Sequence, residues 1–342
     1  MAELIQSNIG EITDIQPRID DALNRHLITR KRPTISLNPF ELVRLEDYEK
    51  IKTAYLGHKA VWENEGLDIE PLIRSIYILD GATEDNLPNY TNTDLFRIES
   101  MSEWKGQWIA EERSHGEIMV REMESRGFVD MPGVWLPTRE QNLASGIHLK
   151  VETLADAICY VATQELLTRE AHFHSSRLMD NYAKRNLRDI GADEGRHYQF
   201  YLSVLSAIVE VNPDMALIAM RNQHEKDNFS MPGKKGIKGY SKLALVIALS
   251  GVFDAITVLR AQKQTIDESG MLISCPTTDE GKSALEWANT LSDNSDKIWL
   301  DNQTKLDEFR FKTAQKIKSS QRPFILGHTV EIIGNQFTPI DN

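Results

Sequence analysis

Cysteine and long apolar runs are both scarce in this sequence. Its 342 residues include two cysteines, Cys159 and Cys275, and no Cys-x-x-Cys pair, so we expect reduced, structural thiols and no disulfide framework. The most apolar run, residues 243–253, is far shorter than the ~20 residues of a membrane-spanning helix. The first residues carry neither the basic nor the apolar segment of a secretory signal. The sequence therefore predicts a cytoplasmic protein without a membrane span.

Basic residues are in the minority. The 39 lysines and arginines stand against 51 aspartates and glutamates, which gives a formal net charge of −12. This balance argues against a protein that coats nucleic acid, because phosphate binding depends on an excess of positive charge. Hydrophobic residues make up 41% of the chain and charged residues 26%, which are the values of an ordinary globular protein.

The spacing of apolar residues favours helices almost throughout. Apolar residues recur at intervals of three and four, whereas strictly alternating apolar runs are scarce. The chain also has only 12 prolines and 19 glycines to interrupt it. We therefore predict an all-α protein.

Four of the predicted helices carry polar residues on stripes that are otherwise apolar. These helices cover about residues 67–90, 99–124, 151–178 and 190–205. Their inward polar residues are Glu84, Glu112, His115, Glu165, Glu194 and His197. The second and fourth helices hold a Glu-x-x-His pattern, whose acid and imidazole stand one turn apart on one face, and the first and third hold a single acid.

The order of these helices repeats along the chain. Glu84 precedes Glu112 by 28 residues and Glu165 precedes Glu194 by 29, so a single-acid helix is twice followed by a Glu-x-x-His helix. Two Glu-x-x-His patterns alone are a weak signal, but their repeated order indicates an internal duplication. One Glu from each of two helices and Glu-x-x-His from each of two others is the ligand set of ferritin-like di-iron bundles.

The charges of this set also point to metal. Four carboxylates on apolar stripes cannot remain ionised in a dry core without compensating positive charge. Two Fe²⁺ ions would cancel the four glutamate charges, and a mixed set of oxygen and nitrogen ligands suits iron or manganese better than zinc. The alternative is that Glu84 and Glu165 are exposed on helices of a different phase, and that His115 and His197 are ordinary core residues.

Two further acids adjoin the predicted ligands. We pair Asp193 with His115 and Glu111 with His197, since a carboxylate that accepts the second N–H of a ligating imidazole fixes its tautomer. The alternative for Glu111 is an acid on a solvated helix face.

Two polar residues follow Glu165 on the same helix face. The hydroxyl of Thr168 either hydrogen-bonds to metal-bound oxygen and passes protons, or bonds back to the carbonyl four residues earlier. We expect His172, one turn farther on, to be a core or channel-mouth residue and not a ligand.

Several stretches around these residues resemble the soluble acyl-carrier-protein desaturases of plant plastids and actinobacteria. They are residues 80–90 (DGATEDNLPNY), 104–116 (WKGQWIAEERSHG), 192–197 (ADEGRH), Gln164 and Glu165 with Thr168, the turn at 230–232 and the run at 322–324. The resemblance extends over about residues 20–332. It implies that the six inward residues are iron ligands and that Thr168 supplies the hydroxyl on the oxygen side of the site.

The resemblance also implies an architecture and a reaction. The architecture is a single ferritin-like domain over residues 1–342, with a core bundle at about 67–205 and additional packed helices at about 206–332. The 50 residues from His115 to Glu165 allow the long crossover that such bundles use. The reaction is an O₂-dependent desaturation, with two Fe²⁺ per chain, that introduces a cis double bond into a saturated fatty-acyl chain on acyl carrier protein. A ferredoxin-type protein would donate electrons to the enzyme, which would form a homodimer.

Three other functions are compatible with the same residues. A related di-iron oxygenase would hydroxylate or N-oxygenate another carrier-bound or free substrate, since one ligand set supports several oxidations. An iron-storage protein would have no use for the long C-terminal part, and a structural protein would hold no metal.

A carrier protein would need a basic surface on which to dock. Acyl carrier proteins are acidic, so docking on a chain with a net charge of −12 requires a local positive patch. Our candidates for this patch are Lys234, Lys235 and Lys238.

Overall fold

The computed structural model describes most of the helical part of the chain. The described residues are 16–18, 20–21, 50, 52–56, 70–87, 101–144, 151, 153–224, 243–244, 247–248, 252–319, 330–333 and 336–339. The predicted docking residues Lys234, Lys235 and Lys238 lie outside them.

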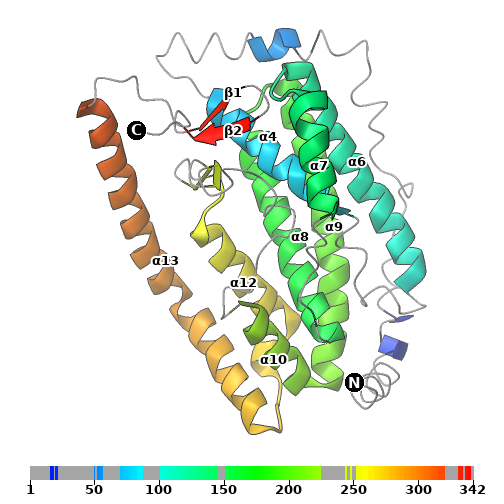
Figure 1. The fold of residues 1–342 in the computed structure, drawn as a ribbon. Helices are drawn as coiled ribbons and strands as arrows, with labels where there is room; N and C mark the ends of the chain where they lie inside the picture. Colours follow the sequence, from blue (N-terminus) through cyan, green and yellow to red (C-terminus); the bar gives the residue numbers. More distant parts are fainter. Residues whose placement is uncertain are drawn as a thin grey trace.

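Helices form nearly all of the described structure (Figure 1). The long helices are α4 Glu70–Glu84, α6 Ser102–Arg126, α7 Leu136–Ala144, α8 Leu154–Ser176, α9 Asn181–Val211, α10 Pro213–His224, α12 Ala255–Ser269 and α13 Asp279–Ser319. A π-helical turn, Met131–Trp135, precedes α7, and a short 3₁₀ turn, Met271–Ile273, follows α12. Two antiparallel strands, β1 Val330–Ile333 and β2 Gln336–Pro339, follow α13. The predicted all-α class is confirmed, and this small hairpin is an addition that the sequence did not indicate.

Local sequence signals define the ends of the helices that carry the site. Thr153 and Asp156 form a reciprocal capping box at the start of α8. Asp180 caps α9 by accepting hydrogen bonds from two backbone N–H groups of its first turn. α6 ends at Gly127, whose φ of 66° lies in the left-handed region that glycine adopts without strain. These caps satisfy backbone groups that a helix end leaves without partners.

The helices pack around the pair α8 and α9. This pair has the most extensive contact between elements, and α4 packs against α6, which in turn contacts α9. α10 and α12 contact both α8 and α9, and α13 runs along their outer side (Figure 1). No helix within the described residues is both long and apolar enough to cross a membrane.

Two large apolar clusters lie on either side of a polar layer, and a third, small cluster consists of Leu166, Leu167, Tyr198 and Ala261. The first contains, among others, Trp104, Trp108, Ile158, Tyr201 and Leu205. The second contains, among others, Tyr77, Ile118, Met119, Phe128 and Ile190. α6 passes from the first cluster to the second and α9 passes from the second to the first, so the Glu-x-x-His segments of both helices fall between the clusters.

The same clusters reveal the direction of α8. Its first turns lie in the first cluster and the residues just after it lie in the second, so α8 runs parallel to α6. The chain therefore has to return along the bundle between the end of α6 at Arg126 and the start of α8 at Leu154. This connection is the long crossover that the spacing of His115 and Glu165 allows.

Candidate metal centre

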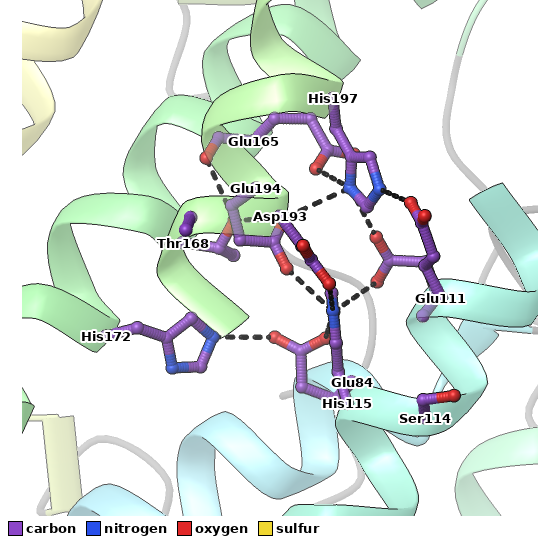
Figure 2. A network of polar contacts seen from close by, with 12 residues as sticks. Glu84, Glu111, Ser114, His115, Glu165, Thr168, His172, Asp193, Glu194 and His197 are labelled. Atoms are coloured by element: carbon purple, nitrogen blue, oxygen red, sulfur yellow. Dashed lines mark hydrogen bonds and ion pairs between the residues drawn. The ribbon is translucent and has the colours of Figure 1, made fainter. Parts of the chain in front are cut away.

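All six inward residues meet in the polar layer between α4, α6, α8 and α9. They are Glu84, Glu112, His115, Glu165, Glu194 and His197, and none of them is more than 8% exposed. The alternative in which Glu84 and Glu165 lie on exposed faces is therefore wrong, because the exposed fractions of these residues are 5% and 2%. Figure 2 labels five of these residues, all but Glu112, together with their polar neighbours.

The six residues form two overlapping groups of four. One group, here called the Glu84 position, consists of Glu84, Glu112, His115 and Glu194. The other, the Glu165 position, consists of Glu112, Glu165, Glu194 and His197. Within each group one ligand atom from every residue lies within 4.8 Å of the others. Two acids are thus common to both positions, and each position has one acid and one histidine of its own.

A glycine allows α4 to end close to α6. A Cβ atom at Gly116 would lie 3.4 Å from the backbone carbonyl carbon of Glu84 and 3.4 Å from the backbone nitrogen of Asp85. A methyl group would already be in van der Waals contact there, and a larger side chain would press against the end of α4. The small residue after His115 therefore helps to place Glu84 beside that histidine.

Each histidine directs its Nδ1 atom toward the acids. His115 Nδ1 lies 3.0 Å from Glu194 Oε1 and 3.9 Å from both Glu84 Oε2 and Glu112 Oε2. His197 Nδ1 lies 3.0 Å from Glu112 Oε1 and 3.2 Å from Glu165 Oε2. The centroids of the two rings are 6.0 Å apart. The acids and the two Nδ1 atoms therefore converge on one buried volume.

The opposite nitrogen of each ring contacts an acid outside the ligand groups. His115 Nε2 lies 3.3 Å from Asp193 Oδ2, and His197 Nε2 lies 2.8 Å from Glu111 Oε2. Glu111 is 1% exposed, so it does not lie on a solvated face. Arg196 hydrogen-bonds to Asp193 and lies 3.8 Å from Glu111, so one cation joins both outer acids. These contacts leave each Nδ1 atom as the ring nitrogen that can bind a metal.

The donor atoms present fit a pair of metal ions. Among the described residues, Glu112 Oε1, His115 Nδ1, Glu165 Oε1 and Glu194 Oε1 are buried and make no hydrogen bond. A buried polar atom without a partner costs about 1–3 kcal/mol, so four in one place need an explanation. Carboxylate oxygens and imidazole nitrogens that converge from four helices are suitable ligands for divalent transition metals. A two-metal centre would satisfy all four atoms.

Burial changes the protonation of these groups in the absence of metal. Burial, followed by repulsion from Glu194, raises the pKa of Glu112 to about 8. The same two causes raise the pKa of Glu165 above its ordinary value. Burial would also raise the pKa of Glu194, but the close approach of the His115 and His197 imidazoles outweighs it and lowers that pKa. Burial would lower the pKa of both histidines, yet the surrounding acids raise it. Metal binding must therefore displace protons.

Thr168 bonds back to its own helix, as one of its two predicted roles requires, while its contact with metal-bound oxygen stays a prediction. Its hydroxyl lies 3.1 Å from the backbone carbonyl oxygens of Gln164 and Glu165, and 3.2 Å from Glu194 Oε2. The hydroxyl therefore lies beside a shared acid while it also bonds back to its own helix.

A cavity adjoins the site on the side of Glu84. It measures about 90 Å³ and has a wall of apolar residues, namely Leu79, Leu167, Ala171, Ala244, Ile247 and Phe253. Its polar edge consists of Asp80, Thr83, Glu84, Thr168 and His172. The cavity thus joins an apolar space to the group of buried acids.

Two contacts at the site could not be anticipated from the sequence. His172 was expected to be a core or channel-mouth residue, and it lines the cavity while its Nε2 lies 3.1 Å from Glu84 Oε1 (Figure 2). Arg196 follows Asp193 by three residues, which is a weak signal because such pairs are common on helix surfaces.

The chain is similar to known proteins over most of its length. A family model described as fatty acid desaturase matches residues 15–305. DesA1 of Mycobacterium tuberculosis, named as an acyl-carrier-protein desaturase, is 28% identical over 254 residues, which cover 70% of this chain and 72% of DesA1. The chloroplast palmitoyl acyl-carrier-protein 4-desaturase of Coriandrum sativum is 24% identical over 238 residues, which cover 64% of this chain and 61% of that protein.

A solved structure is also similar. The crystal structure of DesA2 from Mycobacterium tuberculosis aligns with a TM-score of 0.54 over 81% of this chain and 99% of DesA2. The two sequences are 18% identical in this alignment, so the likeness concerns the fold alone. It confirms the predicted helical architecture.

Proposed function

The chain belongs to the fatty acid desaturase family, and we propose that it introduces a cis double bond into a saturated fatty-acyl chain carried on acyl carrier protein. The family resemblance seen in the sequence is confirmed by the match over residues 15–305. The observation that carries the proposal is the pair of buried ligand groups that share Glu112 and Glu194 and adjoin an apolar cavity. Relatives named as acyl-carrier-protein desaturases support the carrier-bound substrate.

The ligand groups would hold two iron ions per chain. In this proposal Glu84 and His115 belong to one ion, Glu165 and His197 belong to the other, and the remaining two glutamates are shared. The four glutamate charges would balance two Fe²⁺ ions. When bound, the iron ions supply the chemistry of O₂ activation that removes two hydrogen atoms from adjacent methylene groups.

The cavity would hold the part of the acyl chain that reacts. Its wall of leucine, isoleucine, alanine and phenylalanine side chains excludes water and suits a hydrocarbon. Glu84 and Thr168 lie at its edge, so a chain in the cavity would pass beside the metal ligands. A chain held in this place would have its reacting methylene groups fixed beside the metal ligands, and the reaction depends on this orientation.

The protein's other residues would orient ligands and handle protons. Asp193 and Glu111 hold the Nε2–H of His115 and His197, which keeps each Nδ1 atom directed inward. Thr168 holds a proton at Oγ1, 3.2 Å from Glu194 Oε2, where the hydroxyl can donate toward the buried site.

The proposal includes partners that the chain must meet. Reduction of O₂ to water requires two electrons beyond those taken from the substrate, and a ferredoxin-type protein would donate them. Lys234, Lys235 and Lys238 would contribute to the surface on which acidic acyl carrier protein docks. We further propose that residues 1–342 form one ferritin-like domain and that the enzyme is a homodimer.

Mass spectrometry of the products tests the function directly. Purified protein loaded with Fe²⁺ would be incubated with a panel of acyl carrier proteins that bear chains of different length, under O₂ and with a reduced ferredoxin system. A desaturase yields a product that has lost two hydrogen atoms. A product that has gained an oxygen atom would instead identify a hydroxylase or N-oxygenase. Iron uptake far above two ions per chain, without change in the acyl chain, would identify a storage protein.

A further inference from the structure

The Glu84 position and the Glu165 position have equivalent contacts at their histidines. Asp193 contacts the Nε2 atom of His115, and Glu111 contacts the Nε2 atom of His197. Both histidines are fully buried, and both direct Nδ1 toward the shared acids. This equivalence follows from the internal duplication, which places an acid immediately before the Glu of each Glu-x-x-His segment.

The positions differ at their unshared acids. Glu84 Oε1 accepts a hydrogen bond from His172 Nε2 over 3.1 Å, and this bond joins α8 to the last residue of α4 (Figure 2). His172 is 1% exposed, so water does not compete for the bond. No N–H or O–H group of the described residues donates a hydrogen bond to Glu165 Oε1. Glu165 Oε2 lies 3.2 Å from His197 Nδ1, which is itself a proposed ligand. Within the described residues, Glu84 is therefore held by a residue outside the ligand groups, and Glu165 is not.

The duplication does not repeat this contact. His172 is the seventh residue after Glu165, whereas the seventh residue after Glu84 is Thr91. α4 ends at Glu84, whereas α8 continues beyond Glu165 and carries His172, so only one half of the duplicated plan supplies a histidine to the unshared acid of the other half.

We propose that His172 is a positioning residue that fixes Glu84 and makes the Glu84 position the tighter of the two metal positions. This inference rests on the proposed two-metal function. A carboxylate with one oxygen held by an N–H donor presents its other oxygen in a constant direction, and it loses less freedom when a cation binds. The contact of Glu165 with His197 Nδ1 would give way to metal binding, so Glu165 keeps no donor outside the ligand groups and can change its orientation during turnover. The first divalent cation therefore binds at the Glu84 position.

A Co²⁺ titration of the full-length, metal-depleted protein tests this proposal without reference to activity. Calorimetry and visible absorbance should resolve two binding steps in the wild type. His172→Leu should weaken the tighter step by about 10- to 100-fold, the range found when residues that orient metal ligands are removed, and should leave the weaker step unchanged. His172→Gln retains an N–H donor near the position of Nε2 and should restore most of the lost affinity.

A second histidine on α8 provides the matched control. His174 lies two residues farther along, is half-buried, and contacts the backbone oxygen of Val252 over 2.9 Å instead of a proposed ligand. His174→Leu should leave both binding steps unchanged. Equal weakening by His172→Leu and His174→Leu would show a general loss of structure and would overturn the proposal.

Two further variants assign the steps even if His172→Leu does not fold. Glu84→Gln should remove the tighter step, and Glu165→Gln should remove the weaker one. Two results would overturn the role of His172 while leaving the two-metal function in place. One is that Glu84→Gln removes the weaker step and Glu165→Gln the tighter one, and the other is that His172→Leu keeps both affinities. A wild-type protein that binds no Co²⁺ would overturn the proposed function and this inference together.

Discussion

Replacement of Glu165 by glutamine should have opposite consequences in the metal-free and metal-bound protein. Glu165 is 2% exposed, and its burial, with the charges of neighbouring acids, raises its pKa above the ordinary value of a glutamate. The metal-free protein therefore tends to hold this side chain as a neutral acid, which glutamine resembles in shape and charge. We expect Glu165→Gln to change the free energy of unfolding of the metal-free protein by no more than about 1 kcal/mol, the net worth of one hydrogen bond.

The metal-bound protein should lose much more stability when Glu165 is replaced by glutamine. The four ligand glutamates balance two divalent cations, so a neutral side chain at position 165 leaves one positive charge uncompensated in a buried site. Removal of a residue that only orients a ligand costs about 10- to 100-fold in affinity, so loss of a ligand should cost at least ~100-fold. A free Co²⁺ concentration 100 times the dissociation constant stabilises a folded protein by about 2.7 kcal/mol, and a 100-fold weaker site gains about 0.4 kcal/mol under the same conditions.

Urea unfolding with and without Co²⁺ measures both effects on the same samples. The wild type and Glu165→Gln should unfold at nearly the same urea concentration without metal, and only the wild type should gain the full stabilisation with metal. A variant that gains as much stability from Co²⁺ as the wild type does would show that Glu165 is not a metal ligand. A metal-free variant that loses several kcal/mol would refute the inference that the buried acid is neutral.

Four further predictions concern other parts of the molecule. Thr168→Val should leave metal content unchanged and lower the ratio of product formed to O₂ consumed, because the hydroxyl beside Glu194 is lost while the shape is kept; an unchanged ratio would reduce Thr168 to a packing role. Gly116→Val should weaken metal binding at the Glu84 position, since its side chain would press against the end of α4, and a Co²⁺ isotherm equal to that of the wild type would contradict this. Burial lowers the pKa of His224 from 6.5 to about 3, so the stability that neutral His224 confers above pH 6.5 is lost as the pH falls toward 3. The free energy of unfolding of the wild type should therefore exceed that of His224→Asn by an amount that shrinks by about 2 kcal/mol between about pH 7 and pH 5, and a pH-independent difference would show that the half-buried His224 is not held neutral. Higher ionic strength should lower kcat/KM for acyl carrier protein without changing iron content, because docking charges act over about 10 Å at about 0.1 M salt; kinetics that do not respond to salt would exclude a basic docking patch.

The helices and the members of the site could be predicted from the sequence because a buried helix face repeats every three or four residues, and charged residues on that face stand out. A helix that packs against a core shows apolar residues every three or four positions, and an acid on that stripe, such as Glu84 or Glu165, is conspicuous. The repeated order of single Glu and Glu-x-x-His narrowed the set to six residues. The structure brings all six together, and the outer acids Asp193 and Glu111 lie beside the histidines with which the repeat paired them.

The sequence could not show how the six residues divide between the two positions. Glu112 and Glu194 are shared while Glu84 and Glu165 are not, and this depends on the distances between α4, α6, α8 and α9. Periodicity along one helix specifies which face is buried, but it does not specify how far that face lies from another helix. The cavity beside Glu84 also depends on distances between elements, because its wall combines residues from α4, α8 and the segment before α12.

Single contacts between distant residues were decided by the tertiary structure alone. His172 and Glu84 are separated by 88 residues, and nothing in either helix marks the imidazole as the partner of that acid. The contact forms because α8 and α4 approach each other at the height of the polar layer, which the two apolar clusters determine together. Local sequence therefore determined which side chains are buried, and the register between helices determined which of them touch, since register depends on the packing of every helix at once.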